Sequence, residues 1–259
     1  MAGIKGVLLD IDGVLVTSWH PIGGAVDAMR ELRERGLARA YLTNTTSRTC
    51  REIAESLRAA GFEADPDEIV TAARLTAEYL RSTYPGARVW VLNSGDITPD
   101  LDGIELDEHD PQVVVLGGAG PEFTHRALSR VLELMFDGVP VVAMHRGTTW
   151  ATRDGLRLDT GAYLPGLEEV SGASVVSVGK PSLSAFLTAT DVMGTEPDAT
   201  VMVGDDLTAD VLAAQSVGLT GVLVRTGKFR QSVLDLSERR PDHVIDSVAQ
   251  LPALLDGLA

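Results

Sequence analysis

Two carboxylates spaced by one residue stand directly after the first apolar segment of this 259-residue chain. The segment Gly6–Leu9 is apolar throughout, which is typical of a strand buried on both faces, and Asp10 and Asp12 follow it. Side chains two residues apart in a strand point the same way, so both carboxylates are expected at the strand's carboxyl end. Two like charges this close are costly unless a cation or a proton separates them. The pair therefore predicts a site, with a solvated strand end carrying two loop aspartates as the alternative.

Two further segments offer groups that bind anions. Thr43 and Asn44 open a run of hydroxyl and amide side chains, Thr43–Ser47, between an expected strand and an expected helix. Such groups at a helix start form an anion site, or simply an N-cap for the helix. Lys180 precedes Pro181, which suits the first turn of a helix, so the lysine is expected at a helix N-terminal edge. A lone lysine is more often a solvated surface charge.

A second acidic cluster follows the expected strand Thr200–Val203. Asp205 and Asp206 stand at its carboxyl end, and Asp210 comes four residues later. Acidic residues also favour the first turn of a helix, so a capped helix start is the alternative interpretation. Hard divalent cations such as Mg²⁺ prefer carboxylate and carbonyl oxygens, which Asp10 and Asp205 would supply from two strands of one sheet. With Lys180, Thr43 and Asn44 on phosphoryl oxygens, the segments together predict one phosphoryl-transfer site.

The elements that must position these residues alternate between strand and helix almost throughout. Strands are predicted over residues 6–9, 38–42, 88–92, 112–116, 140–144, 200–203, 221–224 and 243–246. Helices are predicted near residues 25–35, 48–60, 66–82, 122–136, 182–193 and 209–217. Alternation of this kind implies parallel strands joined by right-handed crossovers. Tyr84-Pro85-Gly86 breaks the pattern. We therefore expect residues 84–179 to form a domain inserted into an outer domain of residues 1–83 and 180–259.

Composition narrows the class of protein. Hydrophobic residues make up 44% of the chain and charged residues 23%, as in a globular protein. The net charge of −15 argues against a nucleic-acid partner, since phosphate backbones demand a basic face. The single cysteine, Cys50, excludes an internal disulfide and a cysteine-rich metal site. No signal peptide and no apolar stretch long enough to span a bilayer are evident, so we expect a cytoplasmic enzyme with no membrane partner.

In combination and order, these motifs resemble those of the haloacid dehalogenase (HAD) superfamily of phosphohydrolases. The resemblance spans nearly the whole chain, and the long insertion resembles the class IIA, NagD-like arrangement with a large cap. Residues 158–163 with Leu167-Glu168 resemble the end of that cap. Residues 204–218 and 224–230 resemble two branches, the phospholysine phosphohistidine inorganic pyrophosphate phosphatases and their dehalogenase-like hydrolase neighbours. His145-Arg146 resembles the second branch, whereas Thr148-Thr149-Trp150 departs from the expected arginine and aromatic pair.

The resemblance implies a fold and a mechanism. The fold is α/β, a Rossmann-like doubly wound parallel sheet forming the HAD core, with an inserted α/β cap domain of the C2 type. Asp10 would be the nucleophile, forming an aspartyl phosphate, and Asp12 the general acid and base. Mg²⁺ would be held by Asp10, the backbone carbonyl of Asp12 and Asp205. Thr43 and Lys180 would stabilise the transition-state oxygens.

The remaining site expectations concern support and recognition. Asp206 and Asp210 would hold metal-bound waters or orient Lys180. In the inserted domain, His145, Arg146 and Trp150 suit recognition of the substrate body. The alternative is that Trp150 packs inside the domain and that His145 is a solvated loop residue.

Several functions remain open from the sequence. The leading expectation is an Mg²⁺-dependent phosphatase acting on a small phosphorylated compound, phosphoamide or pyrophosphate. A phosphomutase of the same superfamily and a non-catalytic phosphate-binding regulatory protein are the alternatives. A hydrolytic dehalogenase is disfavoured by Asp12, because that reaction has no leaving oxygen to protonate. The expected partner is a small phosphorylated substrate, a homodimer is left open, and the physiological substrate is not encoded in any motif.

Overall fold

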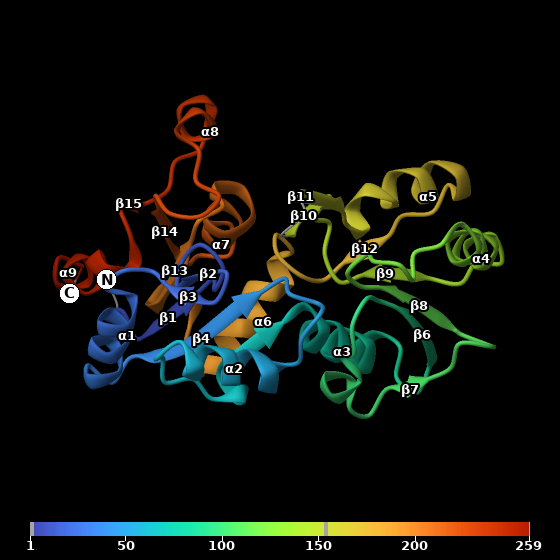
Figure 1. The fold of residues 1–259 in the computed structure, drawn as a ribbon, viewed down its shortest axis with the longest axis horizontal. Helices are drawn as coiled ribbons and strands as arrows, with labels where there is room; N and C mark the ends of the chain where they lie inside the picture. Colours follow the sequence, from blue (N-terminus) through green and yellow to red (C-terminus); the bar gives the residue numbers. More distant parts are fainter. Residues whose placement is uncertain (1–2, 153–154, 259) are drawn as a thin grey trace. The chain divides into compact units, whose positions relative to one another are not determined.

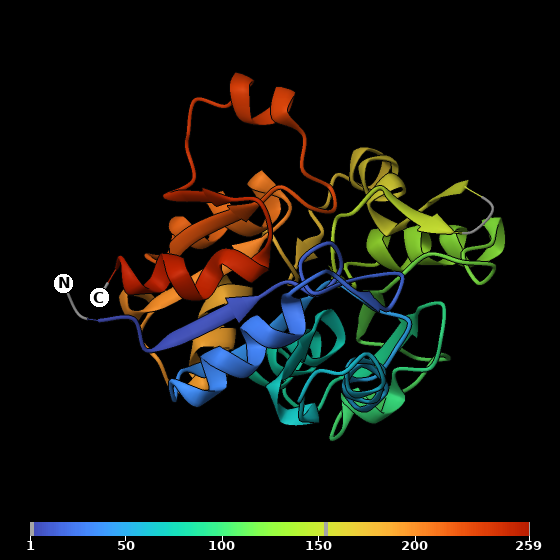
Figure 2. The same cartoon turned by 60° about the vertical axis from the view of Figure 1, so that its left-hand side comes forward.

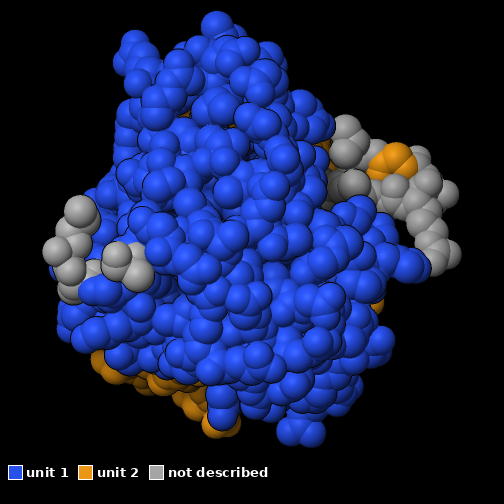
Figure 3. All heavy atoms as spheres, turned by 90° about the vertical axis from the view of Figure 1, so that its left-hand side faces the viewer, with its two compact units in different colours: residues 1–43, 50–70, 180–259 blue, residues 44–49, 71–179 orange. Residues whose placement is uncertain are grey.

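The computed structural model describes residues 3–152 and 155–258. Contacts within the chain divide it into two units, shown in separate colours in Figure 3. Unit 1 comprises residues 1–43, 50–70 and 180–259, and unit 2 comprises residues 44–49 and 71–179. No helix of the described residues is both long and apolar enough to cross a membrane.

Unit 1 is built on a six-stranded sheet with the order β15-β14-β13-β1-β4-β5 (Figure 1). The strands are β1 (Gly6–Leu9), β4 (Ala38–Thr43), β5 (Ile69–Thr71), β13 (Thr200–Gly204), β14 (Thr220–Val224) and β15 (His243–Ile245). The pairs β15–β14, β14–β13, β13–β1 and β1–β4 are parallel. Every residue of β1 is buried, as its apolar sequence predicts, and Leu9 lies in register with Val203 on one side and Tyr41 on the other.

The helices of unit 1 other than α8 bury apolar residues against this sheet. Their bounds are α1 (Ala25–Glu34), α2 (Cys50–Ala59), α6 (Leu183–Met193), α7 (Ala213–Gln215), α8 (Gln231–Leu236) and α9 (Leu251–Asp256). In α1, Met29 and Leu32 lie on the buried face, and in α2 Ile53 and Leu57, four residues apart, do the same. A π-helix, Leu207–Leu212, leads directly into α7. The hairpin β2 (Val16–Thr17) and β3 (His20–Pro21) follows β1, and both ribbon views show α8 standing away from the sheet (Figures 1 and 2).

Unit 2 contains a second parallel sheet, of order β12-β9-β8-β6-β7. Its strands are β6 (Arg88–Leu92), β7 (Glu105–Leu106), β8 (Val113–Leu116), β9 (Val141–Ala143) and β12 (Val176–Ser177). The helices are α3 (Ala72–Thr83), α4 (His125–Phe136) and α5 (Leu164–Ser171), and β10 (Thr149–Thr152) pairs with β11 (Gly155–Leu158) as an antiparallel hairpin. Alternate residues of β8 face opposite sides: Val114 and Leu116 pack with α4 and α5, whereas Val113 and Val115 pack with α3. The predicted α/β class, with parallel sheets covered by helices, is confirmed.

The predicted helix over residues 66–82 is wrong at its beginning. Pro66–Glu68 forms a short 3₁₀ turn, Ile69–Thr71 is strand β5, and the helix α3 begins only at Ala72. Ile69, Val70 and Thr71 are β-branched and fully buried, which favours a strand at the edge of the sheet beside β4. Thr71 then ends the strand and caps the helix, because its hydroxyl accepts a hydrogen bond from the Arg74 amide at 3.1 Å.

The division of the chain by contacts also differs from the expected domain boundary at residues 83 and 84. Helix α3 belongs to unit 2, together with the short segment 44–49. The reason is packing, since Ala73, Ala77 and Leu80 of α3 share one buried cluster with Val89 and Val113 of the unit 2 sheet. The break at Tyr84-Pro85-Gly86 therefore ends a helix inside unit 2 and does not separate the two units.

Candidate active site

The carboxyl ends of three neighbouring strands in unit 1 carry the predicted polar residues. Asp10 follows β1, Thr43 ends β4, and Asp205 follows β13. Strand β1 lies between β4 and β13, so the chain crosses to opposite sides of β1 at this point. Open α/β sheets bind their ligands in the crevice that such a reversal leaves at the carboxyl edge. The Asp10 amide donates a hydrogen bond to the Val203 carbonyl at 2.9 Å, which fixes Asp10 beside the end of β13.

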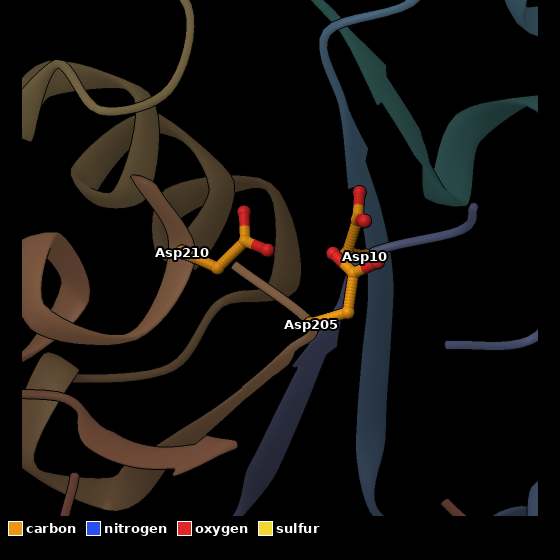
Figure 4. A group of neighbouring side chains, drawn as sticks. All are labelled: Asp10, Asp205 and Asp210. Atoms are coloured by element: carbon orange, nitrogen blue, oxygen red, sulfur yellow. The ribbon is translucent and has the colours of Figure 1, made fainter. Parts of the chain in front are cut away.

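Three buried carboxylates meet at this edge. Asp10, Asp205 and Asp210 each offer an oxygen within 4.8 Å of the others, and their side chains face one another in Figure 4. Asp205 is 1% exposed and Asp210 is 2% exposed, so water screens these charges little. A group of carboxylate oxygens in this arrangement is the kind of site that a divalent cation with a preference for oxygen takes.

One buried lysine enters the same cluster. The Nζ atom of Lys180 lies 2.6 Å from Oδ1 of Asp10 and 2.8 Å from Oδ1 of Asp210. The ammonium group thus bridges two of the three carboxylates and leaves negative charge in excess. Lys180, which the sequence placed only at a helix N-terminal edge, therefore contacts both acidic motifs. The alternative of a solvated lysine is wrong, since Lys180 is 5% exposed.

The excess negative charge shifts the acidity of the cluster. Burial raises the pKa of Asp10 to about 6, although Lys180 pulls it down and Asp210 pushes it further up. Burial and the neighbouring charge of Asp10 raise the pKa of Asp205 to about 7. Burial alone would lower the pKa of Lys180, but Asp10 and Asp210 outweigh it and hold the pKa above its usual value. The carboxylates are therefore poised to bind either protons or a cation near neutral pH.

Within the described part of the chain, one carboxylate oxygen of Asp205 accepts a hydrogen bond, and the other does not. Its Oδ2 accepts a hydrogen bond from the Lys228 amide at 2.7 Å. Its Oδ1 is buried and has no hydrogen-bond partner among the described residues. A buried acceptor without a donor is costly, and a cation would satisfy it. Together with the all-oxygen donor set, this orphaned atom fits a divalent metal ion.

Two glycines enclose the held oxygen of Asp205. Gly13 has φ +84° and Gly227 has φ +62°, and a Cβ atom on either would lie 2.0 Å or 1.9 Å from Oδ2 of Asp205. The hydroxyl of Thr226 donates to the Gly13 carbonyl and so ties the two glycine loops together. Only glycine combines this left-handed backbone with such a close approach. The loops of residues 13 and 226–228 therefore form a tight seat for the Asp205 carboxylate.

We predict that Gly227→Ala weakens binding of a divalent ion and lowers stability more than backbone strain alone can. The added methyl group meets the Asp205 carboxylate, in addition to straining a residue of positive φ by about 1–3 kcal/mol. Gly36→Ala is the matched control, because Gly36 has φ +72° and a Cβ atom added there would meet nothing within 4 Å. Thermal melting with and without Mg²⁺ measures both effects. If the two variants lose the same melting temperature and respond equally to Mg²⁺, Gly227 has no special role in holding the Asp205 carboxylate.

The other acidic residues of the motifs lie in different settings. The side chain of Asp12 is exposed, and its backbone pairs with Val16 in an isolated bridge. Asp206 caps the following helical segment, since its Oδ1 accepts hydrogen bonds from the amides of Thr208 at 3.0 Å and Ala209 at 2.9 Å. Oδ2 of Asp210 accepts from the Asp206 amide at 3.2 Å, while Oδ1 meets Lys180. The structure thus brings Asp210 into the carboxylate cluster and gives Asp206 a capping contact.

The boundaries between the two units fall, along the sequence, beside the three predicted anion-binding residues. Thr43 is buried at the end of β4 and belongs to unit 1, whereas Asn44, the next residue, belongs to unit 2. Lys180 is likewise the first residue of unit 1 after Gly179 of unit 2. Thr43 and Lys180 therefore belong to the same unit as the carboxylate cluster, whereas Asn44 belongs to unit 2.

The residues expected to recognise the substrate lie in unit 2. His145 is 4% exposed, so the alternative of a solvated loop histidine is wrong. Its Nε2 lies 3.7 Å from Oδ2 of buried Asp159, and its Nδ1 accepts a hydrogen bond from the Gly147 amide at 3.1 Å. Arg146 contacts Glu168 at 2.6 Å and donates to the Val175 carbonyl at 3.0 Å. Trp150 lies on β10, and its side chain is outside the described residues.

Sequence reasoning missed the part played by residues 226–228. On sequence alone the segment after β14 shows only a family resemblance, and Gly227-Lys228 lacks the upstream glycines of a Walker loop. Its position offered a signal, because a loop after a strand beside β13 opens at the same sheet edge as Asp205. Asp10, Asp205 and Asp210 also hold the pKa of the Lys228 side chain above its usual value, although burial opposes them.

Comparison with protein families supports the same identification of motifs. The model of haloacid dehalogenase-like hydrolases matches residues 7–107, which include Asp10, Asp12 and Thr43. A second model, described as HAD-hydrolase-like, matches residues 177–251, which include Lys180 and Asp205. The two matches therefore cover the segments that meet at the carboxyl edge of the unit 1 sheet.

The chain is similar over nearly its whole length to curated proteins and to a solved structure. It is 34% identical to bovine (Bos taurus) haloacid dehalogenase-like hydrolase domain-containing protein 2, across 95% of this chain and 96% of that protein. It is 35% identical to the phospholysine phosphohistidine inorganic pyrophosphate phosphatase of Danio rerio, across 98% and 96%. The structure of NagD from E. coli K-12 matches with a TM-score of 0.87 and 29% identity, covering 96% of this chain and 98% of that one.

Proposed function

This chain belongs to the haloacid dehalogenase-like hydrolases as a class IIA phosphatase, and from that premise we propose that it hydrolyses a small phosphorylated compound with Mg²⁺, through an aspartyl phosphate on Asp10. The observation that carries the proposal is the buried cluster of Asp10, Lys180, Asp205 and Asp210 at the carboxyl edge of the sheet. A nucleophile, a fixed cation and an unsatisfied carboxylate oxygen lie there within a few ångströms of one another.

The proposed chemistry has two steps. In the first, an oxygen of Asp10 forms a bond to phosphorus while the bond from phosphorus to the leaving oxygen breaks, and Asp12 gives that oxygen a proton. In the second, Asp12 takes a proton from water, the water oxygen attacks phosphorus, and the bond to Asp10 breaks to release inorganic phosphate. The exposed side chain of Asp12 supports this division, because it can face the substrate and water while Asp10 stays buried.

Stabilisation of the transferring group would come from residues that are fixed before substrate arrives. Lys180 is held by Asp10 and Asp210, and its raised pKa keeps it charged at neutral pH. We propose that Lys180, Thr43 and Asn44 hold the phosphoryl oxygens, and that Asp210 orients the lysine. Fixed charges of this kind need little reorganisation during the reaction.

The proposed metal site uses Asp10, Asp205 and the backbone carbonyl of Asp12. A bound Mg²⁺ would offset the negative charge of the cluster and of the phosphoryl group. The orphaned Oδ1 of Asp205 and the raised pKa values of Asp10 and Asp205 support a cation at this position. Asp206 would act indirectly, by capping the helical segment that carries Asp210.

The printed name of one relative supports a set of candidate substrates. One relative is named for phospholysine, phosphohistidine and pyrophosphate, so phosphoamides and pyrophosphate join phosphomonoesters as candidates. We propose that His145, Arg146 and Trp150 contribute to recognition in unit 2. The pairing of His145 with Asp159 and of Arg146 with Glu168 supports a role in shaping their loop as well. A cytoplasmic location and a homodimer also remain proposals.

The test is a panel of phosphomonoesters, phosphoamino acids and pyrophosphate, each incubated with Mg²⁺ and with a chelator. We expect release of inorganic phosphate from at least one small compound, and loss of that release with the chelator. Product analysis separates the alternatives, because a phosphomutase returns an isomeric phosphate ester. Tight binding of phosphate compounds without turnover would favour the non-catalytic regulatory protein and overturn the proposal.

A further inference from the structure

A second lysine lies beside the carboxylate cluster, in the loop that follows β14. Strand β14 is the neighbour of β13 in the unit 1 sheet, so the loops after both strands open at the same carboxyl edge (Figure 1). The backbone amide of Lys228 donates a hydrogen bond to Oδ2 of Asp205 at 2.7 Å. This hydrogen bond fixes the start of the Lys228 side chain directly beside the Asp205 carboxylate.

The loop that carries Lys228 is held on both sides by contacts within unit 1. Before the lysine, the hydroxyl of Thr226 donates to the Gly13 carbonyl. After it, the guanidinium group of Arg230 donates to the carbonyls of Lys228 at 3.1 Å and of Phe229 at 2.9 Å. The backbone around Lys228 is therefore bonded in place, which limits the positions that its side chain can reach.

The charge of Lys228 acts on the carboxylate cluster from outside it. Enclosure by the protein alone would lower the pKa of Lys228, but the three clustered aspartates outweigh it and hold the pKa above its usual value. Asp10 has the largest effect of the three, ahead of Asp205. Among the described residues, none accepts a hydrogen bond from the Lys228 ammonium group or forms an ion pair with it. Its three N–H donors can therefore take a ligand from solution.

A hollow of about 120 Å³ opens at this loop, and the residues that line it include Asp205, Lys228 and Phe229. About 10–15 Å³ suffices for one water molecule, so the hollow has room for a small anion. Lys228 itself is exposed, whereas Asp205 is buried. A ligand that enters from solution can thus meet the lysine on its way to the carboxylate cluster.

Formal charges show what a second lysine adds to the site. In the buried cluster, three carboxylates against the ammonium group of Lys180 leave a charge of −2 (Figure 4). The nearby carboxylate of Asp206 is offset by the helix amides that it caps. A bound Mg²⁺ would bring the cluster to zero, and Lys228 would then make the site positive. In a chain with a net charge of −15, such a local positive charge attracts an anionic substrate.

We propose that Lys228 is a second cationic ligand for the phosphoryl group of the substrate: its backbone amide holds Asp205, and its ammonium group binds a phosphoryl oxygen beside Asp10. This inference rests on the proposed function, which places the phosphoryl group on Asp10. The two lysines then differ in one respect. Lys180 is buried and already paired with two carboxylates, whereas Lys228 is exposed and gains its partner when the anion arrives.

The experiment compares Lys228→Met and Lys228→Arg with the native enzyme. Both variants keep the backbone amide that holds Asp205, and only Lys228→Met removes the charge. In Lys228→Met, the inhibition constant of inorganic phosphate and KM for an aryl phosphate should rise about 10- to 100-fold, the scale of a hydrogen bond to a charged group. Calorimetric affinity for Mg²⁺ without phosphate should increase about 2- to 10-fold, because a positive charge near the ion is removed. Lys228→Arg should recover most of the phosphate affinity.

Arg225→Met is the matched control. It removes one positive charge from the same loop, but the Arg225 guanidinium is paired with exposed Asp246 at 3.2 Å. Its phosphate inhibition constant and its Mg²⁺ affinity should both stay within about twofold of the native values. Lys228→Gln, which also lacks the charge, repeats the test if Lys228→Met does not fold.

Opposite changes in the two affinities identify the proposed role, since a loosened loop would weaken the binding of both ions. Native phosphate inhibition in Lys228→Met overturns the inference. A joint loss of phosphate and Mg²⁺ affinity, or an equal effect of Arg225→Met, overturns it as well. Failure of the proposed function looks different, because the native enzyme would then neither bind phosphate with Mg²⁺ nor release it from any compound of the panel. If the native enzyme does both and Lys228→Met matches it, only the role of Lys228 fails.

Discussion

Asp10→Asn should lower kcat by about four orders of magnitude or more, with the fold intact. The amide has the shape of the carboxylate but is a poor nucleophile, and loss of the nucleophile in a covalent mechanism costs on this scale. Burial is the largest cause of the raised pKa of Asp10, so removing its charge removes a desolvation cost that outweighs the lost ion pair with Lys180. We therefore expect the melting temperature of the metal-free variant to equal or exceed that of the native protein.

The matched control for lost charge is Asp205→Asn, which removes the same charge from the same cluster but keeps the nucleophile. Raised Mg²⁺ should restore part of the activity of Asp205→Asn and none of that of Asp10→Asn. Beryllium fluoride, which mimics an aspartyl phosphate, should inhibit the native enzyme and fail to bind the Asp10→Asn variant. Turnover of Asp10→Asn within tenfold of the native rate would rule out covalent catalysis by this residue.

The second large effect distinguishes the proposed role of Asp12 from that of Asp205. Asp12→Asn should lose about 10²- to 10⁴-fold in kcat, the usual scale for a general acid and base, and keep its affinity for Mg²⁺. Its side chain is exposed, and the proposed metal contact there is a backbone carbonyl, which the substitution preserves. Asp205→Asn should weaken Mg²⁺ binding by about 100-fold or more, since even the hydrogen-bond partners of metal ligands contribute 10- to 100-fold.

Titration calorimetry at several pH values measures this difference. With pKa values of about 6 for Asp10 and about 7 for Asp205, both carboxylates lose their protons as pH rises. Native Mg²⁺ affinity should therefore increase from about pH 5 to pH 8 and level off above, because the ion binds the deprotonated forms. In Asp205→Asn the increase in Mg²⁺ affinity should end about one pH unit lower, because only the Asp10 carboxyl then titrates. Equal Mg²⁺ affinity in Asp12→Asn and Asp205→Asn would refute the division of roles.

The same groups make the stability of the metal-free protein depend on pH. Both folded-state pKa values lie above the ordinary value of 3.8, so the folded protein binds more protons than the unfolded chain between these limits. The contribution of these two carboxyl groups to stability is then fully present below about pH 4 and is lost as pH rises through about 6 to 7. Mg²⁺ should offset that loss, so the rise in melting temperature on adding the ion should be larger at pH 7.5 than at pH 5.5.

The sequence could predict most of the fold because its signals are local. The apolar run of β1 and the amphipathic spacing of Ile53 and Leu57 need no distant residue to be recognised. Strand β5 was missed because Ile69–Thr71 fits either an apolar helix face or a buried strand when read alone. Pairing beside β4 decides between them, and pairing is a long-range property.

The sequence by itself determined which polar residues gather at the candidate site. Asp10, Thr43 and Asp205 each follow or end a strand, and parallel strands bring their carboxyl ends to one edge whatever the loops do. That rule made one site predictable from residues nearly 200 positions apart in the chain.

Only the tertiary structure decided how those groups are held. The seat of Asp205 needs Gly13 and Gly227 in contact with the same oxygen, and Lys180 reaches both Asp10 and Asp210. The hydrogen bond that the Asn93 side chain donates to the Thr46 carbonyl likewise joins two loops that no spacing rule connects. Close contacts of this kind depend on how whole loops pack against one another. Their hydrogen bonds and clashes vary over fractions of an ångström, whereas a sequence pattern records only which face or edge a residue occupies.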